Sequence, residues 1–133
     1  MKNVGFVSDY FKESLLGGGE LNDGNLINYL QINNQITKIE SSRASIDEIS
    51  KLDSLIIGNF VLLSEEVKNF IIKEKKYIIY EHDHKYVNTR DPSKFSNFKI
   101  PLNNIINKNF YENSYYTVVL SNICKKVLQK NLP

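Results

Sequence analysis

Short apolar runs alternate along this chain with segments whose apolar residues recur every three or four positions. Five of the runs have the length of a β-strand: Asn3–Ser8, Gln35–Glu40, Ser54–Gly58, Tyr77–Tyr80 and Tyr116–Leu120. The first run is apolar on both faces, which is typical of a central strand in a parallel sheet. Because helices are expected between the strands, the pattern predicts an α/β fold, a Rossmann-like doubly wound parallel sheet with helices on both faces.

The segments between the predicted strands carry helix signals. Residues 18–32 place apolar side chains at helical spacing. Ser45 and Glu48 form a capping box, so a short helix is expected to begin there. Ser64 is a cap for a further helix, with glutamates in its first turn and lysines near its end, an order that suits the helix dipole. A last helix is expected over residues 122–130.

The order of the strands decides where a ligand would bind. We expect the common doubly wound order 3-2-1-4-5, in which strands one and four are neighbours at the point where the order reverses. Ligands of such sheets bind beyond the carboxyl ends of the strands at that point. The segments that arrive there are Asp9–Gly19 and Glu81–Lys85, and we expect them to converge. The polar stretch Lys85–Pro101 is expected outside the core, as a functional or mobile loop.

Composition narrows the class of protein. The 133 residues suit one domain, and the formal net charge of +2 is too small to favour nucleic acid or an anionic membrane as a partner. One cysteine, Cys124, cannot form an internal disulfide, which suits a reducing compartment. No leader and no apolar run of about 18 residues is present, so we expect a cytoplasmic domain without a transmembrane segment. The chain stops directly after a predicted helix, which we interpret as a domain boundary.

Three consecutive glycines, Gly17, Gly18 and Gly19, open the first predicted helix and are followed by Glu20. Glycines at a helix start let a ligand approach the backbone and leave N–H groups free to meet an anion. A tight strand-to-helix connection is the alternative interpretation. No Lys-Ser/Thr follows, which excludes a P-loop, and the third glycine of a dinucleotide fingerprint would fall on Asn22.

Both histidines of the chain lie in the run His82-Asp83-His84. On an extended backbone the two rings point to one side. Zinc would need a third and a fourth ligand, and none has an obvious spacing, so we expect no metal. One histidine suits a base, or a hydrogen-bonding group for a phosphate or a sugar hydroxyl; polar capping of a strand end is the alternative.

A further acid is expected at the same edge of the sheet. Asp9, at the end of the first strand, is expected either to bind a hydroxyl or to serve only the loop. A receiver domain of the two-component type is excluded, because the third strand ends in Gly58-Asn59 where a phospho-acceptor aspartate is required.

Three segments together resemble a known family. Gly17-Gly-Gly-Glu20 resembles the opening of the N-terminal domain of GT-B glycosyltransferases of the retaining family four. The run Tyr80-Glu-His-Asp-His84 is similar to the end of that domain's fourth strand. Residues 116–122, followed by a helix with Lys125, Lys126 and Leu128, resemble its last strand.

The resemblance implies a transfer of sugar from a nucleotide-diphosphate sugar, the donor substrate, with no cofactor and no metal. It places Gly17, Gly18, Gly19 and Glu20 near the donor, His82 with Asp83 at the reacting sugar, and His84 as the alternative histidine. The loop Lys85–Pro101 would select the acceptor, a sugar, glycan or glycolipid. Arg90 and Lys94 in this loop are expected either to contact an acidic acceptor or a lipid head group, or to be solvated surface residues.

The resemblance also implies a partner. A GT-B enzyme needs a C-terminal donor-binding domain, on the same or a separate chain, and an isolated N-terminal domain is expected to be inactive and to self-associate. The competing hypothesis is a stand-alone Rossmann-like module that binds a nucleotide or a protein without catalysis.

Overall fold

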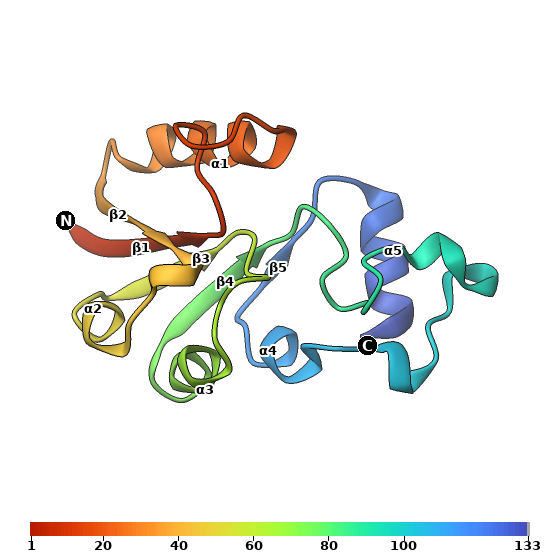
Figure 1. Cartoon of the computed structure of the whole chain (residues 1–133). Helices are drawn as coiled ribbons and strands as arrows, with labels where there is room; N and C mark the ends of the chain where they lie inside the picture. The colour runs from red at the N-terminus through yellow and green to blue at the C-terminus, as the bar shows by residue number, and fades with distance from the viewer. Residues whose placement is uncertain (133) are drawn as a thin grey trace.

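The computed structural model describes residues 1–132, which form a parallel sheet flanked by helices (Figure 1). The strands are β1 (Lys2–Ser8), β2 (Asn34–Glu40), β3 (Ser54–Ile57), β4 (Lys76–Tyr80) and β5 (Thr117–Val118). The helices are α1 (Gly18–Leu30), α2 (Ile46–Ser50), α3 (Glu65–Glu74), α4 (Lys108–Glu112) and α5 (Asn122–Asn131). The predicted α/β class with helices on both faces is therefore confirmed.

The strand order is β2-β1-β3-β4-β5, and every neighbouring pair is parallel. The predicted order 3-2-1-4-5 is wrong, because β3 lies between β1 and β4. The reversal of direction therefore falls between β1 and β3, as in flavodoxin-like sheets. The polarity of the strands explains the order: β2 is a polar edge strand, whereas the apolar β3 is buried at three of its four positions.

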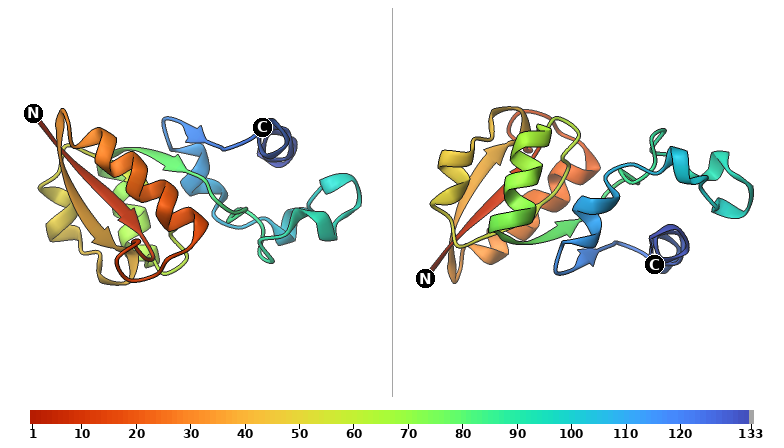
Figure 2. Two further views of the ribbon diagram at one scale, coloured as in Figure 1. Left: turned by 90° about the horizontal axis from the view of Figure 1, so that it is seen from above. Right: turned by 90° about the horizontal axis from the view of Figure 1, so that it is seen from below.

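Two apolar layers hold the helices on the sheet. Helix α1 covers one face, and α2 and α3 cover the other (Figures 1 and 2). Ile27 of α1 packs in one layer with Phe6, Phe11 and Ile56. The opposite layer is larger and joins side chains of β1, β3 and β4 to α3 and to the chain after β4. Burial of this kind stabilises by roughly 25 cal/mol per Å² of apolar surface.

The helix caps follow the sequence signals. The side chains of Ser45, Ser64 and Ser121 each accept a hydrogen bond from a backbone N–H in the first turn of α2, α3 and α5. Gly17, the N-cap of α1, offers no such side chain. Helix α1 is therefore the one of these four whose first N–H groups are not served by a capping side chain.

The chain after β4 departs from the prediction. It is not outside the core: Tyr86 and Val87 are fully buried and Ile100 nearly so. Strand β5 has two residues where five were expected. Helix α5 lies away from the sheet, beside the segment of short 3₁₀ turns at Pro92–Lys94 and Ser96–Phe98 (Figure 2).

Asn131 fastens α5 to that segment. Its side chain accepts from the backbone N–H of Ile100 at 2.9 Å and donates to the carbonyl of Phe98 at 2.9 Å.

No helix within residues 1–132 combines the length and the apolar character needed to cross a bilayer.

Candidate functional site

The carboxyl ends of β1, β3 and β4 bring four chain segments to one edge of the sheet. Ser8 ends β1 and Asp9 follows it, Gly58 and Asn59 follow β3, and His82 lies shortly after β4. The first turn of α1 returns to the same edge. The predicted convergence of the segments 9–19 and 81–85 is confirmed, although β3 separates their strands.

A buried hydrogen bond joins α1 to the segment after β4. His82 Nε2 lies 2.6 Å from Asp23 Oδ1, with the Asp23 side chain fully buried and the His82 side chain 7% exposed. Asp23 Oδ2 accepts a hydrogen bond from the Ser8 hydroxyl at 3.3 Å. A Cβ at Gly58 would stand 3.0 Å from the same oxygen and 3.3 Å from the Ser8 hydroxyl oxygen, so a larger residue here would crowd both groups. We call Ser8, Asp23 and His82 the dyad cluster.

The dyad cluster leaves one nitrogen without a partner. Because a carboxylate accepts hydrogen bonds, Nε2 of His82 is the donor in the pair with Asp23. His82 Nδ1 is then the remaining polar atom of the ring. Within residues 1–132 it is the one buried side-chain nitrogen or oxygen that forms no hydrogen bond. An unmet group of this kind costs about 1–3 kcal/mol, and such groups mark sites where a further partner arrives.

The three glycines stand beside this histidine. A Cβ built on Gly19 would lie 3.5 Å from the His82 ring and 3.6 Å from Asn59 Nδ2, so the ring packs over the first turn of α1. Around Gly18 a Cβ would meet no atom within 4 Å. The Glu20 carboxylate folds back toward Gly17, where a Cβ would stand 2.6 Å from its Oε2.

Sequence reasoning missed Asp23. Its position four residues after Gly19 was the available signal, because residues i and i+4 of a helix share a face. The glycine that contacts His82 and the aspartate that bonds it therefore lie one above the other on α1. An apolar-periodicity argument does not detect a polar residue on the covered face of a helix.

Asp9 serves the loop after β3. Its two carboxylate oxygens accept from the backbone N–H groups of Val61 and Leu62, both at 3.0 Å. The side chain is 8% exposed. Asp9 was expected either to bind a hydroxyl or to serve only the loop, and in the structure it contacts the loop.

Asp83 turns away from His82 into a second cluster, which consists of Glu81, Asp83, Lys85 and Tyr111. Lys85 Nζ lies 2.6 Å from Glu81 Oε1 and 3.1 Å from Asp83 Oδ1, and it also bonds the Asp83 carbonyl and Asn59 Oδ1. The hydroxyl of Tyr111 donates to Glu81 Oε2. Burial, with the negative charge of Glu81 beside it, raises the pKa of Tyr111. We call this group the lysine cluster.

The two histidines diverge, so the prediction that they share one side is wrong. Residues 82 and 83 form a bend, not an extended strand. His84 Nδ1 lies 2.8 Å from the Tyr86 hydroxyl and the ring lines a small cavity with Pro92 and Cys124. Of the two candidates, His82 is the histidine at the glycines.

Arg90 lies farther along the same segment. Its guanidinium is 3.5 Å from Asp83 Oδ2 with its side chain 53% exposed. The backbone at Arg90 has φ 59°, a left-handed conformation uncommon for arginine. Arg90 is therefore linked to the lysine cluster and not to the dyad cluster.

The dyad cluster differs from the site of a serine hydrolase. Ser8 bonds Asp23, not His82, so no base is placed to activate its hydroxyl. Among residues 1–132 no three His, Cys, Asp or Glu side chains are arranged to hold a metal ion.

Comparison of the chain with protein-family models, with curated proteins and with solved structures finds no match.

Proposed function

We propose that this chain is the N-terminal domain of a retaining GT-B glycosyltransferase, which moves a sugar from a nucleotide-diphosphate sugar to an acceptor. In this proposal the edge between β1 and β3 is the domain's side of the donor cleft. A C-terminal domain, on the same or a separate chain, supplies the other side.

The observation that carries the proposal is the open space at Gly18. None of the glycines in residues 1–132 has a positive φ, so the backbone at Gly18 accepts an alanine. No neighbouring atom occupies the position of a Cβ there. The fold therefore does not require glycine at this position, whereas a diphosphate resting on the first N–H groups of α1 does.

His82 supports the same assignment. Its free Nδ1 suits a hydroxyl of the transferred sugar, and Asp23 fixes the ring by holding Nε2–H. Gly19 lets the ring lie against the helix start, so the sugar and the diphosphate would meet neighbouring groups. Asp23 acts through His82 and is a positioning residue.

In the reaction the bond between the anomeric carbon and the diphosphate oxygen breaks, and the bonding electrons leave with the diphosphate. An acceptor hydroxyl forms the new bond with retained configuration, and its proton passes to the departing diphosphate. The N–H groups at the start of α1 stabilise the negative charge that develops on the diphosphate. Because these groups are already in position, they need no rearrangement during the step.

Exposed apolar side chains favour a partner domain over a stand-alone module. They come from the loop after β1, the start of α1 and the loop after β3: Tyr10, Leu15, Leu16, Leu21, Val61 and Leu62, each at least 45% exposed. Exposed apolar surface of this kind is typical of an interaction face.

Gly18→Val tests the proposal, with Gly24→Ala as a glycine change in the same helix. The natural polypeptide is incubated with UDP-glucose, UDP-galactose or GDP-mannose, and release of the nucleoside diphosphate is measured. We expect Gly18→Val to raise the Michaelis constant for the donor and to leave the melting temperature within a few degrees. A Cβ at Gly24 would stand 2.8 Å from the Lys12 side chain, so its variant should alter stability more than donor use.

Unchanged donor use by Gly18→Val would contradict the proposal, and so would the absence of turnover with every donor. In the second case a stand-alone binding module becomes the better interpretation.

A further inference from the structure

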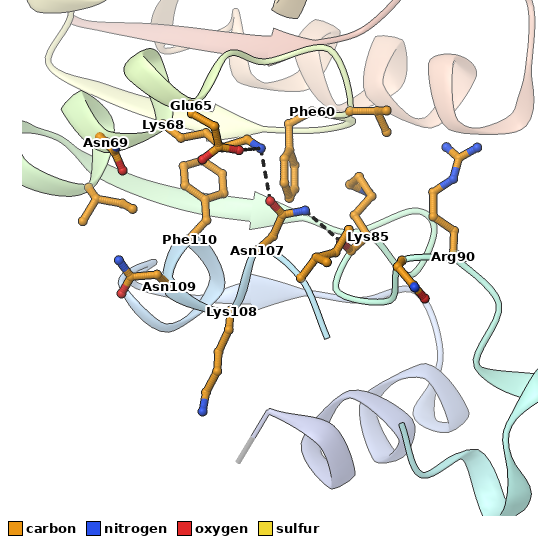
Figure 3. A pocket seen from close by; sticks show the side chains of 14 residues that line it. Phe60, Glu65, Lys68, Asn69, Lys85, Arg90, Asn107, Lys108, Asn109 and Phe110 are labelled. Atoms are coloured by element: carbon orange, nitrogen blue, oxygen red, sulfur yellow. Dashed lines mark hydrogen bonds and ion pairs between the residues drawn. The ribbon is translucent and has the colours of Figure 1, made fainter. Parts of the chain in front are cut away.

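A cavity of about 720 Å³ lies on the α3 face of the sheet, away from α1 and the dyad cluster. It is bounded by the turn after β3, by α3, by the chain after β4 and by α4 (Figure 3). Its size falls within the range of about 300–1,000 Å³ that small-molecule sites occupy. Nothing in the proposed donor cleft accounts for it.

The inner wall of the cavity is already formed. Lys68 is 8% exposed, and its ammonium donates to Glu65 Oε1 at 3.0 Å and to Asn107 Oδ1 at 3.1 Å. The other end of the Asn107 amide donates to the carbonyl of Lys85 at 2.9 Å. Figure 3 shows these two bonds crossing from α3 to the chain after β4. A ligand would thus meet a rigid wall rather than one that must be assembled.

The cavity walls carry more cations than anions. The charged side chains that line it are Lys68, Lys85, Arg90, Lys108 and one carboxylate, Glu65. Arg90 and Lys108 are about half exposed, and their acids Asp83 and Glu112 stand 3.5 and 3.7 Å away, outside the cavity lining. Exposed pairs of this length contribute about 0–1 kcal/mol, so a ligand anion can replace either acid.

Amide side chains supply the remaining polar surface. Asn69, Asn88 and Asn109 line the cavity together with Asn107. Amides both donate and accept, which suits the hydroxyl groups of a sugar. Phe60 and Phe110 are buried and pack on each other at 5.0 Å between ring centroids, so neither offers an open face on which a nucleobase could stack.

We propose that this cavity binds an anionic saccharide, a sugar that carries a phosphate or a carboxylate, as the acceptor of the proposed transfer. The sugar hydroxyls meet the asparagine amides. Arg90 and Lys108 lie at opposite sides of the rim (Figure 3), and the anionic group meets one of these two cations. The assignment of the sugar as acceptor rests on the proposed function, whereas its binding does not.

Asn59 connects this cavity to the proposed donor cleft. Its Nδ2 lies 3.6 Å from the position of a Cβ on Gly19, and its Oδ1 accepts a hydrogen bond from Lys85 Nζ at 3.2 Å. Lys85 lines the cavity. The Asn59 side chain therefore lies between Gly19 in the proposed donor cleft and Lys85 in the cavity wall. This short separation suits the donor and acceptor sites of one reaction.

The test is an equilibrium titration of the ¹⁵N-labelled chain followed by backbone amide shifts. Glucose 6-phosphate and glucuronate are the anionic probes, and glucose and inorganic phosphate are the two partial probes. We expect the anionic sugars to shift the amides of residues 68–69, 88–90 and 107–109, with much weaker binding of glucose and of phosphate. Arg90→Gln with Lys108→Gln should weaken binding of the anionic sugars about tenfold.

Lys94→Gln is the matched control, because Lys94 is an exposed lysine of the same segment that does not line the cavity. Equal loss of binding in the control would overturn the proposal, as would equal affinity for glucose, affinity for inorganic phosphate alone, or shifts confined to other residues. Binding without sugar transfer would instead contradict the proposed function and leave this site standing. Transfer to neutral acceptors that the rim variants leave unchanged would overturn the site alone.

Discussion

Two buried polar side chains, those of His82 and Lys85, leave the same short segment after β4, and their hydrogen bonds differ. His82 joins Asp23 under α1 with one ring nitrogen unmatched, whereas Lys85 on the opposite side offers three hydrogens to four nearby oxygens. The lysine cluster is complete in itself. The dyad cluster is complete only when another polar group is added.

This difference separates a structural role from a functional one. The lysine cluster, in which each buried group has its partners, fixes the path of the chain after β4. Removal of one member of such a cluster strongly lowers the stability of the fold. A buried group with an unmet hydrogen-bonding atom, such as His82, lowers the stability of the fold until a ligand supplies the missing partner. We therefore expect substitutions in the dyad cluster to change activity and substitutions in the lysine cluster to change folding.

His82→Ala in the natural polypeptide is expected to give the largest effect. Removal of a group that contacts the reacting sugar should lower the turnover number about 10²- to 10⁴-fold. The change also leaves the buried Asp23 carboxylate with the Ser8 hydroxyl, so the melting temperature should fall as well. His84→Ala is the control, because His84 bonds Tyr86 away from the glycines. Equal losses in the two variants, or full activity of His82→Ala, would erase the distinction between the two histidines.

Lys85→Met tests the other side of the comparison. It leaves Glu81 buried without its cation, and we expect it to lower the free energy of unfolding by about 3–5 kcal/mol, measured by urea denaturation. Lys94→Met, at an exposed position, should stay within about 0.5 kcal/mol of the parent chain. A Lys85→Met chain that is as stable as the control would show that the lysine cluster does not hold the segment.

Alkaline pH should weaken the lysine-cluster side of the molecule. Burial raises the pKa of Tyr77, Tyr86 and Tyr111 above the value of about 10 expected in the unfolded chain. Below that value all are protonated in both states. Above it the unfolded chain loses protons that the folded chain keeps, so stability falls as pH rises, by about 1.4 kcal/mol per pH unit for each such tyrosine.

Tyr111→Phe sharpens this expectation. Without the Tyr111 hydroxyl the decline above pH about 10 should be less steep, even though loss of the bond to Glu81 lowers stability at neutral pH. Urea midpoints measured from neutral to alkaline pH give both quantities. An unchanged slope would mean that Tyr111 ionises in the folded chain as it does in the unfolded one.

Gly18→Ala should give the smallest effect on stability, and one of opposite sign. Because its Cβ enters open space and the φ is negative, we expect a gain of about 0.4–1 kcal/mol in the free energy of unfolding. Donor use should fall at the same time, since the added methyl group lies where the diphosphate would rest. A gain in stability with no loss of donor use would make Gly18 a connection residue only.

The regular elements could be predicted from the sequence because they depend on local signals. Ser45 and Ser64 cap helices as their spacing indicated, and β1 to β4 end within two residues of the predicted positions. The strand order could not be read from periodicity, because it depends on which strands bury both faces. The contrast between polar β2 and apolar β3 was the signal that would have corrected it.

The candidate site was predicted in part. Gly19 and His82 were expected at one edge, and they lie together there. Asp23 was missed because it comes from the interior of a helix, and the separation of His82 from Asp83 depends on a bend that no periodic pattern marks. Helix α4, which supplies Tyr111 to the lysine cluster, is too short at five residues to show a helical repeat.

The most direct test of the central claim is the ¹⁵N resonance of His82 Nδ1, followed while a sugar nucleotide is added to the natural polypeptide. We expect this resonance to move to the position of a hydrogen-bonded nitrogen with UDP-glucose, UDP-galactose or GDP-mannose, and the resonances of the His84 ring nitrogens to stay in place. If donor binds and His82 Nδ1 does not move, or if His84 alone responds, the dyad cluster is not the donor site.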